Sequence, residues 1–140
     1  MLVSSKGRYA LRVIIDLAQQ DKDGFVSLKS ISERQEISFK YLEIIIADLN
    51  KAGLVISRRG KDGGYKLSKP VGRYSVGEVL RVAEGDFAST ACLSGDENAC
   101  SRADDCLTIP MWQNLDLLVN NYLDGIKITD LMNRKAHTEE

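Results

Sequence analysis

Two short helical patterns joined by a tight turn, with a hairpin pattern directly after them, constrain the fold of this chain most strongly. Ser27 is placed to cap a helix over residues 28–35, and residues 36–37 form the turn. A second helix is predicted over 39–52, ending at Gly53. The residues expected on the buried side of the two helices are Leu28, Ile31, Leu42, Ile45, Ile46 and Leu49. This order predicts a helix-turn-helix motif.

The hairpin pattern has a long tip that is basic and rich in glycine. Residues 54–57 favour a strand, and residues 65–68 alternate apolar and polar side chains. Between them, residues 58–64 contain two arginines, one lysine and three glycines. A helix-turn-helix followed by such a hairpin is typical of a winged helix-turn-helix, so the predicted fold class is mainly α with a small β-hairpin wing.

The remaining helical patterns lie on both sides of this motif. One helix is predicted over residues 8–20, after the possible cap residues Ser4 and Ser5. Another starts at Ser75, which with Glu78 makes a capping box, and ends near Gly85. Residues 1–85 therefore look like a complete winged helix-turn-helix domain.

The helix predicted over residues 108–125 indicates self-association. Its apolar stripe is formed by Trp112, Leu115, Leu118, Val119, Tyr122 and Leu123. Such a stripe more often packs into the core of its own chain. Because residues 1–85 already resemble a closed domain, we expect this one to pair with a second copy, as recognition helices commonly act in two-fold pairs.

The chain therefore divides into the winged domain 1–85, a cysteine loop 86–107, a dimerisation helix 108–125, and a short terminal helix with a tail 126–140. Thr129 is expected to cap the terminal helix. No apolar run approaches the roughly 18 residues of a membrane span, and the first residues lack the apolar stretch of a secretion signal. We expect a cytoplasmic protein without a membrane partner.

The charges are divided unevenly along the chain. Residues 1–75 hold 14 Lys or Arg against 8 Asp or Glu, a net charge of +6, whereas residues 76–140 hold 5 against 12, a net charge of −7. Charged residues usually serve only to solvate exposed faces. Together with the helix-turn-helix pattern, however, the positive half favours a partner that is a polyanion, such as double-stranded DNA.

Two elements carry the candidate DNA-contacting residues. These are Ser38, Lys40, Tyr41 and Glu43 on the second helix of the motif, and Arg58, Arg59 and Lys61 on the hairpin tip. Glu43 can accept a hydrogen bond from a cytosine amino group, and a hairpin arginine suits a minor groove. A solvent-facing surface or a protein-docking module remains the alternative interpretation of the same residues.

All three cysteines fall in one polar window: Cys92, seven residues, Cys100, five residues, Cys106. Disulfides are rare in a reducing compartment, and thiolates select zinc, copper(I) or iron-sulfur clusters. Structural zinc sites prefer gaps of two to four residues, so these wider gaps favour an iron-sulfur cluster. A cluster needs four ligands. The fourth ligand could be a residue of the partner subunit, a solvent molecule, or one of the loop carboxylates Asp96, Glu97, Asp104 and Asp105. His137 in the tail is a poor candidate.

Several motifs, in chain order, resemble the IscR branch of the IscR/NsrR/CymR regulators. They are SSKGRYA at 4–10, ISERQ at 31–35, IS at 37–38, YLE at 41–43, GLV at 53–55, RG at 59–60, GGY at 63–65, VGEV at 76–79, and CLT at 106–108 with Trp112. The resemblance implies a dimeric transcription factor for palindromic promoter sites, and no enzyme. It also implies control of iron-sulfur assembly genes.

The resemblance assigns DNA contacts to Ser38, Tyr41, Glu43 and Arg59, and cluster ligation to Cys92, Cys100 and Cys106. Of the common cluster types, we expect 2Fe-2S over 4Fe-4S. Ile109 stands where IscR-type proteins have a histidine ligand, and Arg8 stands where nitric-oxide-sensing relatives have an aspartate. The alternative function is a thiol or zinc sensor of the same fold.

Overall fold

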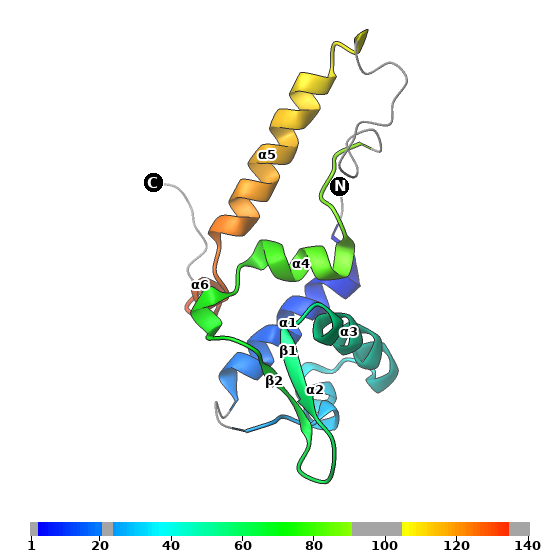
Figure 1. The fold of residues 1–140 in the computed structure, drawn as a ribbon, viewed down its shortest axis with the longest axis vertical. Coiled ribbons are helices and arrows are strands. Elements are labelled where there is room, and N and C mark those ends of the chain that lie inside the picture. The colour runs from blue at the N-terminus through cyan, green and yellow to red at the C-terminus, as the bar shows by residue number, and fades with distance from the viewer. Residues whose placement is uncertain (1–2, 21–23, 91–104, 135–140) are drawn as a thin grey trace.

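The computed structural model describes residues 3–20, 24–90 and 105–134, and every structural statement below refers to these (Figure 1). Its elements in chain order are helices α1 (Ser5–Gln19), α2 (Leu28–Gln35) and α3 (Phe39–Lys51), strands β1 (Val55–Arg58) and β2 (Gly64–Leu67), the 3-10 turn η1 (Val71–Arg73), and helices α4 (Val76–Glu84), α5 (Ile109–Gly125) and α6 (Ile128–Met132). The predicted fold class, mainly α with a hairpin wing, is confirmed.

The helix-turn-helix forms because polar caps begin both helices and one left-handed residue joins them. The Ser27 hydroxyl accepts from the Ser30 amide at 3.2 Å and starts α2. Glu36 ends α2 with a φ of 54°. Ser38 then accepts from the Tyr41 amide at 3.2 Å, so α3 begins almost at once. The turn fixes the direction in which α3 leaves α2.

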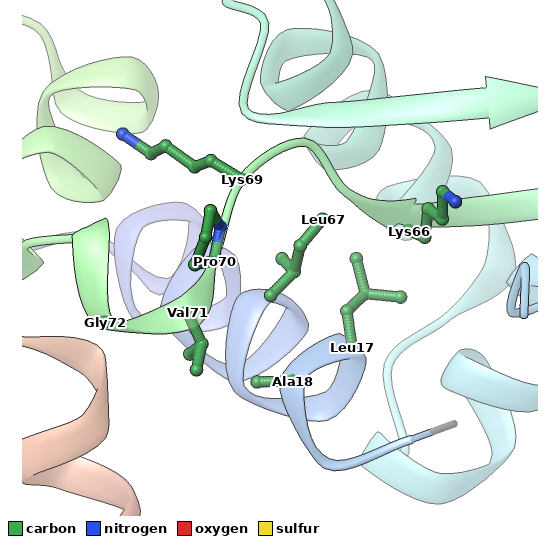
Figure 2. A pocket seen from close by; sticks show the side chains of 8 residues that line it. All are labelled: Leu17, Ala18, Lys66, Leu67, Lys69, Pro70, Val71 and Gly72. Atoms are coloured by element: carbon green, nitrogen blue, oxygen red, sulfur yellow. The ribbon is translucent and has the colours of Figure 1, made fainter. Parts of the chain in front are cut away.

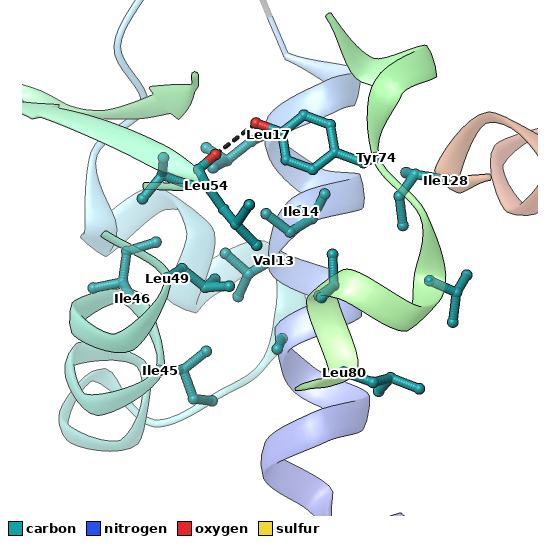
Figure 3. Close-up of a cluster of buried hydrophobic side chains, with 14 of the residues drawn as sticks. Val13, Ile14, Leu17, Ile45, Ile46, Leu49, Leu54, Tyr74, Leu80 and Ile128 are labelled. Atoms are coloured by element: carbon teal, nitrogen blue, oxygen red, sulfur yellow. Dashed lines mark hydrogen bonds between the residues drawn. The ribbon is translucent and has the colours of Figure 1, made fainter. Parts of the chain in front are cut away.

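The core is built around α1, which packs against α2, α3 and α4 (Figure 3). Val13 and Ile14 of α1 are fully buried, together with the four residues of α3 predicted to face inward. Tyr74 is also fully buried, and its hydroxyl donates to the Leu54 carbonyl at 2.5 Å. This bond ties the segment before α4 to the start of the hairpin, without leaving a buried hydroxyl unsatisfied.

The hairpin is antiparallel, with Val55 opposite Leu67 and Arg58 opposite Gly64. Its second strand is also held by the segment before α2, because Val26 and Tyr65 exchange two backbone hydrogen bonds of 2.8 Å. Gly64 lies so close to the Val26 backbone that no Cβ would fit, and its φ is 149°. The wing is therefore anchored at the tip end of β2, and residues 59–63 form the loop beyond this anchor.

The segment after α5 returns to the first half of the chain. The Val76 amide donates to Ile126 at 2.8 Å, and the Ile128 amide donates to Tyr74 at 3.0 Å. Ile128 is fully buried in the same core as α1. The predicted cap Thr129 is wrong, because Thr129 lies inside α6 and the Asp130 carboxylate accepts from the Lys127 amide at the start of that helix.

Helix α5 projects away from the rest of the described structure (Figure 1). Val119 and Leu123 are partly buried and pack against the core, on the side that faces α4. The predicted apolar stripe divides here, since Leu115, Leu118 and Tyr122 are exposed. No helix within the described ranges is long and apolar enough to cross a membrane.

Candidate nucleic-acid interface and cysteine segment

The N-terminal end of α3 presents polar side chains to solvent. Ser38, Lys40 and Glu43 are all exposed, on the side of α3 away from the core. The Ser38 hydroxyl caps the helix through the Tyr41 amide. Because residues near the start of a recognition helix are the ones that meet base edges and phosphates, these three side chains are available for such contacts.

Tyr41 is held differently from its neighbours. It is half-buried, its hydroxyl lies 3.2 Å from the Ser5 hydroxyl, and its ring meets the Tyr9 ring edge-on with centroids 5.8 Å apart. A second contact between the same helices is the 2.6 Å ion pair of Lys6 with Asp48. Tyr41 therefore couples α3 to the first turns of α1.

The three basic residues of the hairpin do not lie in equivalent surroundings. The Arg58 guanidinium stacks over the Phe25 ring at 4.3 Å and donates to the Asp62 carbonyl at 2.8 Å. Arg59 and Lys61 are exposed at the tip. The cation–π contact of Arg58 therefore stabilises the loop. The side chains of Arg59 and Lys61 are available for contacts with a binding partner of the wing. Phe25 had no signal in the sequence.

A buried carboxylate fixes α2 on α1. Asp16 is 1% exposed and accepts from Arg34 at 2.7 and 3.0 Å and from Gln35 at 2.9 Å. The hydrogen bond to Asp16 raises the pKa of Arg34, so the guanidinium of Arg34 stays positively charged. Arg12 donates to the Gln35 side chain at 3.0 Å and to its carbonyl. This network, absent from the sequence prediction, sets the angle at which the helix-turn-helix leaves α1.

Another carboxylate joins the end of α4 to the start of α1. The Glu84 Oε2 atom accepts from the Ser4 amide at 3.0 Å, the Ser4 hydroxyl at 2.5 Å and the Gly7 amide at 3.1 Å. A negative charge is favoured there by the helix dipole. A Cβ on Gly7 would clash with this carboxylate. Glu84 is the last residue of α4, so these bonds lie where the chain enters the cysteine segment.

Cys106 is the one cysteine of the predicted cluster site within the described ranges. It is half-buried, and its sulfur lies 3.3 Å from the Thr108 hydroxyl, just before α5. Cys92 and Cys100 lie outside the described residues, as do Asp96, Glu97, Asp104 and His137. In the part of the chain that is described, no three His, Cys, Asp or Glu side chains gather. The donor set of three thiols suits a soft metal centre.

Two positions bear on the missing ligand. Ile109 is 7% exposed and so is packed as an apolar residue. Arg8 is exposed on α1, with its guanidinium 5.9 Å from the Tyr9 ring. Asp105, the one of the four candidate loop carboxylates that the structure describes, is exposed. Neither family position therefore offers an atom that donates a lone pair to iron, since Ile109 is apolar and Arg8 is a cation.

A pocket of about 310 Å³ lies between α1, β2 and η1 (Figure 2). Its apolar wall includes Leu17, Leu67 and Val71. Its two lysines are engaged elsewhere, because Lys69 pairs with Glu78 at 2.9 Å and Lys66 lies over Phe25 at 4.9 Å. The ammonium groups of Lys66 and Lys69 therefore do not point into the pocket toward a ligand (Figure 2).

Comparison with known proteins agrees with this geometry over nearly the whole chain. The model of the Rrf2 family, described as an iron-dependent transcriptional regulator, matches residues 3–134. The regulator IscR of Yersinia enterocolitica is 40% identical over 135 residues, covering 96% of this chain and 81% of that protein.

Two solved structures superpose along the full length. T. potens IscR has a TM-score of 0.74 and 37% identity, covering 100% of this chain and 93% of the other. CymR, the global cysteine regulator of B. subtilis, has a TM-score of 0.74 and 32% identity, covering 99% of both chains. These relatives are transcription regulators and not enzymes.

Proposed function

This chain belongs to the Rrf2 family of transcription regulators, and we propose that it is a homodimer that adjusts its choice of promoter to iron-sulfur cluster status. Its expected targets are the genes of iron-sulfur cluster assembly. The protein is expected to act in the cytoplasm. The observation that carries the proposal is that an exposed recognition helix packs on α1, and that the thiol segment begins beside the Glu84 contacts to the start of α1.

The DNA contacts are assigned to α3 and the wing. Lys40 and Ser38 would hold phosphates, Glu43 would accept from a base, and Arg59 and Lys61 would reach the neighbouring groove or backbone. Tyr41 and Arg58 are assigned a place at the edge of the interface, because their polar ends already have partners in the protein. A two-fold pair of these surfaces fits a palindromic site.

The dimer is assigned to α5. Met111, Leu115, Leu118 and Tyr122 follow one another at spacings of four, three and four, so they form one exposed apolar stripe. Covering these large apolar side chains with a second copy would remove apolar surface from water, which lowers the free energy of the dimer. The pairing would hold two winged domains at a fixed separation.

We assign the sensing of iron-sulfur cluster status to the cysteine segment, residues 86–107. The thiolates of Cys92, Cys100 and Cys106 would hold a cluster, 2Fe-2S in preference to 4Fe-4S, which supplies a centre whose presence reports iron supply and oxidants. A displacement of Glu84 at the start of this segment would reach the first turn of α1 through Ser4 and Gly7. From there it would reach α3 through the hydrogen bond between Ser5 and Tyr41. DNA choice then changes because the two forms of the protein differ in affinity for a given site.

The test is the visible absorption spectrum of anaerobically purified protein, with iron, sulfide and zinc measured on the same sample. The proposal predicts a coloured protein with equal iron and sulfide. Cys100→Ser should lose the colour and remain a folded dimer, whereas Ser101→Ala, its neighbour in the chain, should keep the colour. A colourless protein that stays colourless after reconstitution would contradict cluster sensing.

A thiol sensor is the second candidate, favoured by the likeness to the cysteine regulator CymR. In that case the same three cysteines respond through oxidation or zinc. A colourless, DNA-binding protein whose operator affinity changes with thiol oxidation or with added zinc would support it.

A further inference from the structure

The exposed side of α3 carries an apolar residue where the DNA-contact assignments above name only polar ones. Ile44 is 52% exposed, and it lies one turn after Lys40 and next to Glu43. Leu42, Ile45 and Ile46, which surround it in sequence, are all 0–1% exposed in the core. Ile44 therefore makes no contribution to the core that would explain a branched apolar side chain at this position.

Ile44 belongs to a stripe with a defined pattern. Lys40, Ile44, Ala47 and Lys51 are all exposed and stand at spacings of four, three and four, so they lie in one line along α3. The apolar pair is in the middle and a lysine is at each end. With a rise of 1.5 Å per residue, the two lysines are about 16 Å apart along the helix.

Charge and shape select the partner of this stripe. An apolar protein surface would have to bury or displace the two lysines, which is unfavourable. A DNA major groove is about 12 Å wide, has phosphates on both rims and has base edges at its floor, including the 5-methyl group of thymine. Lysines at the ends and an aliphatic group between them match that order.

We infer that Ile44 reads the 5-methyl group of a thymine in each half-site, beside the base contacted by Glu43. This inference rests on the proposed placement of α3 against DNA and adds a sequence requirement to it. A carboxylate and an aliphatic side chain next to each other favour a cytosine and a thymine at neighbouring positions, because one base offers an amino donor and the other a methyl group.

The experiment uses the full chain and a duplex selected by it from a random library at fixed salt. Each thymine of the half-site is replaced in turn by uracil, which removes only the methyl group. For one position we expect binding about fourfold weaker per half-site, corresponding to about 0.8 kcal/mol for a buried methyl-sized group. Ile44→Ala, exposed and in a helix, should fold normally and should bind the thymine and uracil duplexes equally at that position.

Ile56→Ala is the matched control, because Ile56 is an exposed isoleucine on the wing strand β1, at 42%. That variant should retain the full preference for thymine. A wild-type protein that binds its selected duplex but tolerates uracil at every position would overturn the inference alone. An Ile44→Ala variant with an unchanged methyl preference would also overturn it. Failure to select any duplex would overturn both this inference and the DNA-binding proposal.

Discussion

The winged domain and helix α5 treat their apolar side chains in opposite ways. Along α3, the four residues predicted to face inward are buried against α1, and Phe39 and Ile44 are the only large apolar side chains among its exposed residues. Along α5, Leu118 is 68% exposed and belongs to a stripe with Met111, Leu115 and Tyr122. The first region is stable because of contacts within one chain. The second has a face that no other described part of the chain covers, and we assign that face to a second copy.

The largest expected effect comes from a charge in the stripe of α5. Leu118→Glu should give monomers, because an unpaired carboxylate would have to be buried in the proposed interface. Losing the second half-site contact should weaken operator binding by on the order of a hundredfold. Sedimentation and operator titration measure the two effects.

The control for this change is Gln113→Glu, which adds the same charge at an exposed position on another side of α5. It should leave both the mass in solution and operator affinity unchanged. If Leu118→Glu remains dimeric, α5 does not form the dimer, and the contrast between the two regions loses its functional meaning.

A change inside the winged domain should do the reverse, lowering stability and leaving association intact. Asp16→Ala removes the acceptor shared by Arg34 and Gln35, and should lower the free energy of unfolding by about 2 kcal/mol. Denaturant titration of the dimer measures it. Asp48→Ala breaks only the partly exposed pair with Lys6 and should change stability by about 0.5 kcal/mol or less. Equal effects of the two variants would show that the buried network does not hold α2.

The surface of the winged domain should respond in specificity and not in stability. Glu43→Ala should lower discrimination at one base pair by about tenfold, because one direct acceptor for a base is lost. Overall affinity should change little. Glu33→Ala removes the same charge from an exposed site on α2 and serves as the control. An equal loss of affinity on all sequences would show that Glu43 does not read a base.

The smallest effect is expected at the end of the winged domain, where α4 leads into the cysteine segment. Glu84→Gln keeps the shape but weakens the bonds to Ser4 and Gly7, and should reduce the affinity difference between cluster-loaded and cluster-free protein by severalfold. Its cost in stability should be about 1 kcal/mol or less. Gly7→Ala should act in the same way, because its Cβ displaces Glu84, whereas Gly72→Ala meets open space and should have no effect. An unchanged affinity difference in both variants would exclude this route.

Local signals in the sequence predicted the elements of the winged domain well. Ser27 caps α2 as expected, the capping box of Ser75 and Glu78 is present, and Gly53 follows α3 with a φ of 80°. These features depend on residues three or four apart, so a sequence pattern contains them. The helical pattern of α1 was recognised from residue 8, and Ser4, one of its two possible caps, does cap the helix, which begins at Ser5.

Contacts between distant residues could not be predicted in the same way. Ser4 and Glu84 are 80 positions apart, and the clamp of Arg34 on Asp16 spans 18. No periodicity encodes such pairs, since they depend on how the helices cross. The stripe of α5 was recognised as one apolar set, yet α4 covers Val119 and Leu123 and leaves Leu118 exposed. Burial depends on the neighbour as well as on the helix.

Titration of a selected operator with cluster-loaded and cluster-free protein, at one salt concentration and in the same buffer, would show whether cluster status controls DNA binding. Fixed salt is essential because phosphate contacts make affinity strongly dependent on it. We predict that the two forms differ in operator affinity by about fivefold or more, which corresponds to a coupling free energy of about 1 kcal/mol between cluster binding and DNA binding. Identical binding curves would contradict cluster-dependent DNA choice, while leaving the chain a DNA-binding regulator.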